Sequence, residues 1–354
     1  MLLVLGVAAM IWGLGRLMRW PAAMVWGLIA LLWLAVFVMH LVLPEGHGLR
    51  AATGGAGRES PVLWGLIGAA AVAGVIYARG LAWLRARAKP PVVAGATTKP
   101  GAFSETELNR YARHIVLREL GGPGQKRLKA AKVLVIGAGG LGSPVLLYLA
   151  AAGVGVIGVV DDDAVDGSNL QRQVIHSDET IGESKVISAA RRMVALNPHV
   201  EVKPYRRRLD EGIAAELFGE FDLIIDGTDN FDTRYMVNRV AVAAGKPLIS
   251  GAITQWEGQL SVFDPGHGAP CYQCVFPEAP AAGLAPSCSE AGVVGPLPGV
   301  VGAMMALEAV KLIAGAGHVL RGEMLIYDGL WGESRKIRVS RRDDCPVCGG
   351  VVAG

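Results

Sequence analysis

The stretch from Lys132 to Gly142 constrains the fold more than any other part of this 354-residue chain. It reads KVLVIGAGGLG, a short run of branched apolar residues that leads into a glycine-rich turn. A strand, a glycine turn and a helix in this order let backbone N–H groups at the helix N-terminus meet a phosphate. Glycine is needed there because a β-carbon would block the tight turn and hold the backbone away from a ligand. The stretch predicts a nucleotide-binding α/β domain.

Charged and polar side chains follow this turn in an order that favours a triphosphate. A second apolar run, GVIGVVD, ends on Asp161, 24 residues after Gly137, where an acid can accept hydrogen bonds from ribose hydroxyls. The run SNLQRQ at 168–173 then supplies an amide and Arg172, and GESK supplies Lys185. Two cations beyond the glycine turn suit a triphosphate better than a dinucleotide, although the turn alone is also typical of an ordinary NAD-binding domain.

Strand and helix patterns alternate from residue 132 onward, which predicts a Rossmann-like, doubly wound α/β sheet. We expect strands at 132–136, up to 160, near 200–204, before 226, and in LISGAIT, GQLSVFD, MLIYD and KIRVS. Helices are expected up to 152 and at 186–196, 213–218 and 300–313, the last preceded by a loop over about 283–299.

The segment FDLIIDGTDN delivers Asp226, Asp229 and Asn230 to the carboxyl end of a buried strand. Ligands of open parallel sheets bind at these ends. Asp229 is therefore placed to meet Mg²⁺, which takes one or two carboxylates together with substrate phosphates. The alternative is that Asp229 serves as the N-cap of a helix near Thr233.

The cysteines give an independent signal, because all five lie beyond residue 270. Two knuckle-spaced pairs, Cys271 with Cys274 and Cys345 with Cys348, suit a closed tetrahedral Zn²⁺ site rather than a secreted disulfide framework. The wide gap between the pairs indicates a clamp that pins the C-terminal tail to the domain. Cys288 is left over, and a lone thiol in a loop is compatible with a bystander or with a nucleophile. The net charge of +3 is too small to indicate a nucleic-acid partner.

The first 85 residues carry the hydrophobic excess of the chain, and they contain two runs long enough for a membrane hairpin. Pro21 to Leu43 is 23 residues without Asp, Glu, Lys or Arg, and Pro61 to Ala78 adds 18 more. Leu2 to Gly15 is shorter, and a first span and a membrane-surface segment remain open for it. Residues 86–103 read as a linker of small residues and prolines, so that the nucleotide-binding domain covers 104–354.

Basic residues predict the orientation of this hairpin. In the loop after Leu43, Arg50 and Arg58 are offset by neighbouring glutamates, whereas the segment after the second run carries Arg79, Arg85, Arg87, Lys89 and Lys99. We expect a protein of the inner (cytoplasmic) membrane whose nucleotide-binding domain faces the cytoplasm. That domain should begin with a helix at Ser104, where Glu107 completes a capping box. Its apolar face would hold Leu108, Tyr111, Ile115 and Val116, and its basic face Arg110 and Arg113.

These motifs together resemble the MoeB/ThiF/HesA family of adenylyltransferases, and the molybdopterin-synthase adenylyltransferases most closely. The resemblance covers about Ser104 to Gly350 and rests on RYARHIVL, GAGGLGS, SNLQRQ, GESK, DGTDN, GAITQWEGQL, CYQC, SCSEAGVVGPLPGVVG and CPVC. In that family the enzyme binds Mg·ATP and the C-terminal Gly-Gly tail of a small ubiquitin-like sulfur carrier. The tail carboxylate attacks the α-phosphate, and pyrophosphate leaves.

The resemblance implies a role for each site residue. Asp161 holds the ribose, Gly140 lies against the nucleotide, and Asp229 serves the metal and the reacting centre. The phosphates are addressed by Asn169, Arg172 and Lys185. The implied ATP site as a whole comprises Gly137, Gly139, Gly140, Gly142, Asp161, Ser168, Asn169, Leu170, Gln171, Arg172, Lys185, Asp229 and Asn230.

Two further residues carry implications from the resemblance. Arg113 matches an arginine that reaches the nucleotide of the neighbouring subunit, which implies a homodimer. Cys288 matches a cysteine that some members use for a covalent link to the carrier, and its role here stays open. The chain carries no sulfurtransferase domain, so a separate sulfur donor is expected.

Other functions remain compatible with the sequence. The nearest is the same reaction on the thiamine-pathway carrier, and a second is a tRNA-modifying dehydratase. A nicotinamide-dependent oxidoreductase would use the glycine turn but leaves Arg172 and Lys185 unexplained. A membrane-tethered scaffold with a decayed nucleotide site is disfavoured by the intact charged residues.

Overall fold

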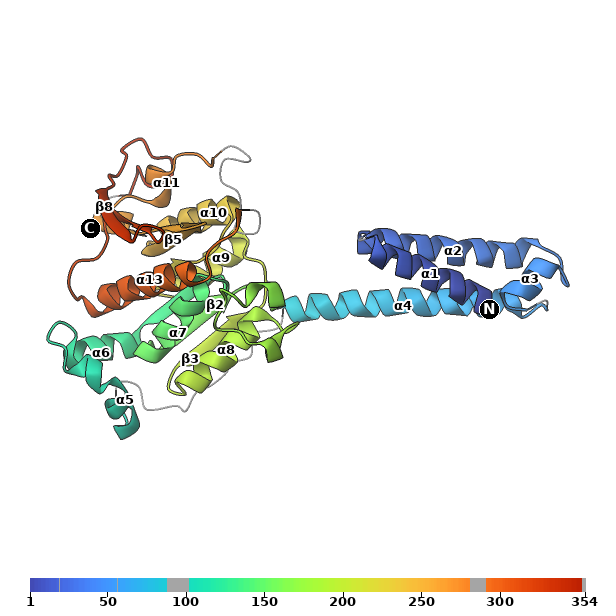
Figure 1. The fold of residues 1–354 in the computed structure, drawn as a ribbon, viewed down its shortest axis with the longest axis horizontal. Helices are drawn as coiled ribbons and strands as arrows, with labels where there is room; N and C mark the ends of the chain where they lie inside the picture. The colour runs from blue at the N-terminus through green and yellow to red at the C-terminus, as the bar shows by residue number, and fades with distance from the viewer. Residues whose placement is uncertain (19, 56, 88–101, 281–290, 352–354) are drawn as a thin grey trace. The chain divides into compact units, whose positions relative to one another are not determined.

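The computed structural model describes all residues other than 19, 56, 88–101, 281–290 and 352–354, and of residues 82–87 it describes the backbone alone. Two compact units divide the chain, Met1–Ala88 and Lys89–Gly354 (Figure 1). Each is described by itself below.

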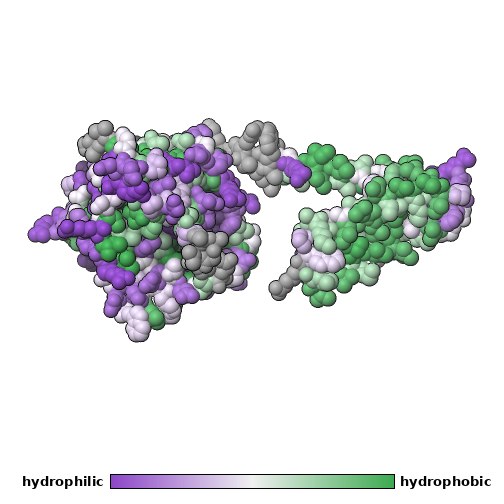
Figure 2. Space-filling view, turned by 90° about the horizontal axis from the view of Figure 1, so that it is seen from above, coloured by the Kyte–Doolittle hydropathy of each residue, from purple (hydrophilic) through white to green (hydrophobic). Residues whose placement is uncertain are grey.

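The N-terminal unit is a helical hairpin with an additional N-terminal helix. It contains α1 (Leu2–Leu17), α2 (Ala22–Val42), the short α3 (Gly48–Thr53) and α4 (Ser60–Arg87). α2 and the Ser60–Leu81 part of α4 are long and apolar enough to cross a membrane, and only 11% of each is buried. Figure 2 shows apolar side chains covering much of the surface of this unit. A face of this kind is unfavourable in water, so the unit is consistent with the predicted membrane hairpin, which stays a prediction.

A buried polar cluster ties the loop of this hairpin together. His40 lies 2.9 Å from the Ser60 hydroxyl and 2.8 Å from that of Thr53. Arg50, which is 4% exposed, donates to the carbonyls of Leu43 and Gly57 at 3.0 and 2.7 Å. Buried polar groups are tolerated because they are hydrogen-bonded, and these bonds hold α3 between the two long helices.

The second unit opens with α5 (Glu105–Ile115), and the predicted capping box is confirmed. The Ser104 side chain accepts from the Glu107 backbone N–H, and the Glu107 carboxylate accepts from the Ser104 N–H in return. The expected apolar face is only partly right. Tyr111 is buried, but Leu108 and Val116 are 47% and 76% exposed, because α5 packs through one narrow stripe. A helix that the sequence patterns did not predict, α6 (Gly121–Ala130), follows.

An eight-stranded sheet forms the centre of this unit, in the order β3-β2-β1-β4-β5-β6-β7-β8. β1 to β5 are parallel, and the remaining three strands extend the sheet in antiparallel pairing. The strands are β1 (Lys132–Ile136), β2 (Val156–Val160), β3 (Glu201–Tyr205), β4 (Leu223–Asp226), β5 (Leu248–Thr254), β6 (Glu257–Phe263), β7 (Glu323–Asp328) and β8 (Glu333–Arg338).

Helices cover both faces of the sheet (Figure 1). Along β1, Val133 and Val135 pack into one core and Leu134 and Ile136 into another, because successive side chains of a strand point to opposite faces. The first core is covered by α7 (Gly142–Ala152), α8 (Lys185–Leu196) and α13 (Pro296–Ala314). The second is covered by α9 (Glu211–Gly219) and α10 (Phe231–Ala243). The predicted α/β class is thereby confirmed.

α13 begins earlier than the sequence patterns suggest. The predicted boundary between the loop and this helix, after Gly299, is wrong, because the helix starts at Pro296. Proline is tolerated in the first turn, where its missing N–H has no intrahelical partner in any case. By length and composition α13 could also cross a membrane, but half of it is buried against the sheet. It is therefore a core helix of this unit.

Candidate functional site

A cavity of about 790 Å³ opens at the carboxyl ends of the parallel strands. The order of the strands places the turns after β1, β2 and β4 side by side around it. Residues from the glycine turn, from the segment after β2 and from the segment after β4 line its wall. The site therefore lies where the topology of an open parallel sheet predicts ligand binding.

The glycine turn between β1 and α7 needs glycine at its two ends for different reasons. Gly137 has a φ of +94°, a backbone conformation that other residues rarely adopt. A β-carbon on Gly142 would lie 1.9 Å from the Gly137 carbonyl oxygen, so only glycine lets α7 start this close to the turn. Between them, Gly139 and Gly140 line the cavity.

Asp161 at the end of β2 is held by two backbone donors. Its Oδ2 accepts from the Ala138 N–H at 2.8 Å and its Oδ1 accepts from the Asp163 N–H at 2.9 Å. Burial raises the pKa of Asp161, although the nearby Lys185 ammonium acts in the opposite direction. A fixed carboxylate beside the glycine turn can accept hydrogen bonds from a diol such as a ribose.

Two cations face the cavity from the segment after β2. Arg172 donates to Asn169 Oδ1 at 2.8 Å, which fixes its guanidinium group. Lys185, the first residue of α8, lies 2.8 Å from Asp163 Oδ2, and its side chain is 6% exposed. These groups add positive charge to the glycine-turn side of the cavity, as an anionic ligand requires.

Asp229 and Asn230 follow β4, and the structure gives them different positions. Asn230 is the N-cap of α10, since its Oδ1 accepts from the Thr233 N–H at 2.9 Å. The alternative in which Asp229 caps this helix is wrong. Asp229 lines the cavity, and within the described part of the chain its carboxylate has no hydrogen bond or ion pair. Asp226, also noted in the sequence, is buried and bonds Thr228 and Ser250.

The structure brings eight of the predicted nucleotide-site residues to the cavity wall: Gly137, Gly139, Gly140, Asp161, Arg172, Lys185, Asp229 and Asn230. Five other predicted residues do not line it: Gly142, Ser168, Asn169, Leu170 and Gln171. Arg113 is exposed on α5 and is not part of the cavity wall in the single chain. Cys288 lies outside the described residues.

Several wall residues lie outside the motifs, among them Asp163 and the pair Arg207–Arg208 after β3, and Gln173, the last residue of the SNLQRQ run, lines the wall without having been assigned to the site. The arginines could have been found from the strand pattern, because they follow β3 directly. His176 was also missed. It lies 2.9 Å from the Ala138 carbonyl and 2.9 Å from the Ser188 hydroxyl, and burial lowers its pKa. A neutral imidazole there links the glycine turn to α8.

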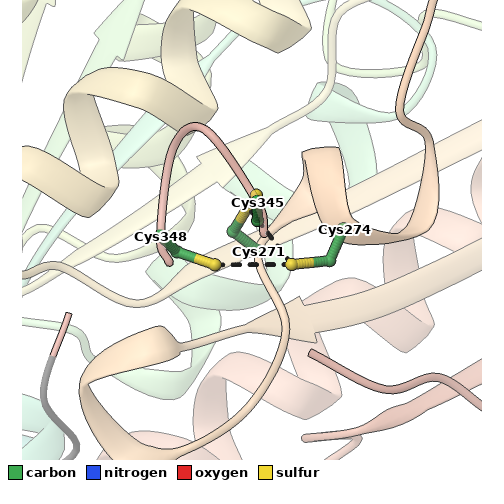
Figure 3. A group of neighbouring side chains, drawn as sticks. All are labelled: Cys271, Cys274, Cys345 and Cys348. Carbon is green, nitrogen blue, oxygen red and sulfur yellow. Dashed lines mark hydrogen bonds between the residues drawn. The ribbon is translucent and has the colours of Figure 1, made fainter. Parts of the chain in front are cut away.

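The four paired cysteines converge at a second site, far from the glycine turn in sequence (Figure 3). Cys271 and Cys274 lie at the start of α11 (Tyr272–Val275), and Cys345 and Cys348 lie in the C-terminal segment. All four are buried, and their sulfurs lie within 4.8 Å of one another.

The spacing of these sulfurs fits a tetrahedral ion. The S···S distance is 3.3 Å for the Cys274–Cys348 pair, 3.6 Å for the Cys271–Cys345 pair and 3.9 Å for the Cys271–Cys274 pair. Four thiolates at about 2.3 Å from a Zn²⁺ ion would be about 3.8 Å apart. N–H groups of Asn238 and Arg342 point at two of the sulfurs, which suits thiolate acceptors.

Comparisons with known proteins agree with this geometry. The ThiF family matches residues 111–347. A sulfur carrier protein adenylyltransferase of Thermus thermophilus is 51% identical over 251 residues, which cover 70% of this chain and 93% of that protein. The adenylyltransferase and sulfurtransferase MOCS3 of Mus musculus is 48% identical over 264 residues, covering 74% of this chain and 56% of that protein.

A solved structure extends the comparison to the fold. The crystal structure of Escherichia coli MccB with ATP matches with a TM-score of 0.58 and 25% identity, covering 68% of this chain and 74% of that one. The chain thus spans nearly all of one curated relative and about half of another, and its fold is that of a protein crystallised with ATP.

Proposed function

Since this chain belongs to the ThiF family, we propose that it is an adenylyltransferase that uses ATP to activate the C-terminal carboxylate of a small sulfur-carrier protein. The observation that carries this proposal is the cavity itself. It combines a glycine turn, a fixed acid, two cations and a carboxylate that has no partner among the described residues. An oxidoreductase that binds a dinucleotide would leave both cations and Asp229 without a role.

The proposed reaction joins two anions, so its main requirement is neutralisation and alignment of charge rather than proton transfer. The carboxylate oxygen of the carrier forms a bond to the α-phosphorus, and the bond from that phosphorus to the β-phosphate bridging oxygen breaks. The products are the carrier acyl-adenylate and pyrophosphate. Arg172 and Lys185 would hold the phosphates, and Asp161 would hold the ribose.

Asp229 would contribute a ligand to Mg²⁺, which when bound supplies positive charge to the phosphates. The donor set fits, because an oxygen ligand faces the cavity without competing bonds in the described part of the chain. The four cysteines would hold Zn²⁺ in a structural role. Its ligand set is closed, so the ion would pin the C-terminal segment to α11 without taking part in the reaction.

The active form would be a homodimer in which Arg113 of one subunit completes the site of the other. Two facts support this. Arg113 is exposed and lies outside the cavity of its own chain, and the neighbouring Leu108 and Val116 leave an apolar strip on α5 open for a partner.

The N-terminal unit would anchor this enzyme to the cytoplasmic membrane as a hairpin, with the catalytic unit in the cytoplasm. The apolar surface of α2 and α4 supports the insertion, and the excess of Arg and Lys after the second run supports the orientation. The carrier would be the small subunit of molybdopterin synthase, with the thiamine-pathway carrier as the alternative. A separate protein would donate the sulfur.

Pyrophosphate exchange tests the central claim. Detergent-solubilised full-length protein with Mg·ATP should exchange labelled pyrophosphate into ATP only when a carrier with a free Gly-Gly C-terminus is present. The matched control is the same carrier without its two terminal glycines, and equal exchange with both carriers would refute the proposal. A pull-down in the presence of ATP would then identify the carrier.

A further inference from the structure

Asp163 is an acidic residue of the cavity wall to which neither the motifs nor the proposed reaction gives a role. It follows the ribose acid Asp161 by two positions and lies 2.8 Å from the Lys185 ammonium. The side chain of Asp163 is 67% exposed, whereas that of Lys185 is 6% exposed. The pair therefore joins a buried cation to an acid that water can reach.

The main chain around the pair forms a short antiparallel clasp outside the central sheet. The Lys185 N–H donates to the Asp163 carbonyl at 3.0 Å, and the Val165 N–H donates to the Glu183 carbonyl at 2.8 Å. Ala164 and Ser184 form an isolated antiparallel bridge between these two bonds. The backbone of Asp163 is thus fixed independently of its side chain.

The same residue connects three parts of the site. The Asp163 N–H donates to Asp161 Oδ1, and Asp161 Oδ2 accepts from the Ala138 N–H of the glycine turn. A continuous chain of bonds therefore runs from the glycine turn through Asp161 and Asp163 to Lys185. A shift of Lys185 relative to the ribose acid would break one of these bonds.

The charge of the buried Lys185 ammonium makes its hydrogen bond to the Asp163 carboxylate necessary. A buried ammonium is costly unless a group of opposite charge accepts from it. It carries three donors, of which Asp163 takes one, and in the described part of the chain no second hydrogen-bond acceptor of this ammonium is seen, although the Asp161 carboxylate also interacts with it electrostatically. The two remaining donors are available to an anion in the cavity.

We propose that Asp163 is a positioning residue that holds the Lys185 ammonium ready for the phosphates of ATP. The inference rests on the proposed function, since it assigns Lys185 to phosphate binding. Asp163 itself also carries negative charge, but water around its exposed carboxylate screens the repulsion from the phosphates. The net effect of Asp163 on ATP binding is therefore favourable.

Binding of two ligands to the full-length, detergent-solubilised protein tests the inference. Asp163→Asn should weaken ATP binding about tenfold, which corresponds to about 1.4 kcal/mol, and should change adenosine binding less than about twofold. A merely structural role would weaken both ligands together. Because the backbone bonds of Asp163 do not need its carboxylate, the variant should fold, and Asp163→Glu should recover part of the ATP affinity.

A double-mutant cycle ties the effect to Lys185. In a Lys185→Met background, Asp163→Asn should cause no further loss of ATP affinity. The matched control is Glu183→Gln, which removes an acid of the same clasp that pairs with Arg191 at 3.2 Å and does not line the cavity. Unchanged ATP binding by Asp163→Asn, equal losses for ATP and adenosine, or a full additional loss in the double variant would each overturn the inference.

These outcomes remain distinct from those of the proposed function, because the measurement contains no carrier. Failure of the carrier assay with normal ATP binding would refute the adenylation proposal and leave the role of Asp163 standing. Absence of ATP binding by the unsubstituted chain would refute both.

Discussion

Replacing Asp229 by alanine should remove most of the activity and almost none of the stability. Its carboxylate is exposed in the cavity and forms no bond or ion pair within the described part of the chain, so its loss should change the unfolding free energy by no more than about 0.5 kcal/mol. Its proposed contact with the metal and the reacting phosphate is worth roughly 3–4 kcal/mol in the transition state. The expected loss of rate is therefore about 10²–10³-fold.

The adjacent residue is the natural control for this variant. Asn230 caps α10 through a 2.9 Å bond to the Thr233 N–H, and loss of such a cap costs about 1 kcal/mol. For a unit of this size that cost lowers Tm by about 2–4 °C. Asn230→Ala should therefore melt earlier than Asp229→Ala, although it should retain far more activity.

Two assays on the same preparations of each variant separate a loss of catalytic rate from a loss of stability. Pyrophosphate exchange measures the rate, and thermal unfolding followed by circular dichroism measures the stability. A rate loss below about threefold for Asp229→Ala would refute its assignment to the reacting centre. A Tm loss for Asp229→Ala as large as that for Asn230→Ala would show that the lost rate came from a damaged fold.

Three further predictions concern the metal, the pH dependence and the membrane. Elemental analysis should find one Zn²⁺ per chain. Cys345→Ser should lower both the zinc content and Tm, whereas Cys288→Ser should leave the zinc content unchanged. A requirement of Cys288 for zinc binding would mean that the ligands are assigned wrongly. Burial raises the pKa of Glu107, but the hydrogen bonds that its carboxylate accepts from Lys129 and from the Ser104 backbone have a larger combined effect and lower this pKa. The ionised carboxylate of Glu107 therefore stabilises the fold above about pH 4.5, and this stabilisation is lost as the pH falls through the lowered pKa. Glu107→Gln should therefore lower Tm by a few degrees at pH 7, about 2–4 °C for each kcal/mol, and the difference should shrink as the pH falls below about 4.5; a constant difference would contradict this. The full chain should stay with membranes in high salt, and deletion of residues 1–100 should release a soluble, active protein. A C-terminal reporter active only outside the cytoplasm would overturn the orientation and the adenylation proposal together.

Features that depend on neighbours along the chain could be predicted from the sequence. The glycine turn, the capping box at Ser104 and the alternation of strands and helices follow from backbone geometry and side-chain period, which act over a few residues. The paired cysteines could be assigned to one cluster because the coordination chemistry of thiolates leaves few other uses for two such pairs. These local signals sufficed for the fold class and for eight of the residues that line the cavity.

The tertiary structure decided which polar side chains serve the fold and which face the ligand. Asp229 and Asn230 are adjacent in sequence, and only the start of α10 shows that the amide caps the helix and the acid faces the cavity. Asp163 meets Lys185 because the segment after β2 folds back as a clasp, a contact across 22 positions that carries no sequence period. Likewise, Leu108 and Val116 have helical spacing, yet packing leaves them exposed. Sequence periodicity specifies which residues share a face of an element, but what that face meets depends on how distant segments close around it.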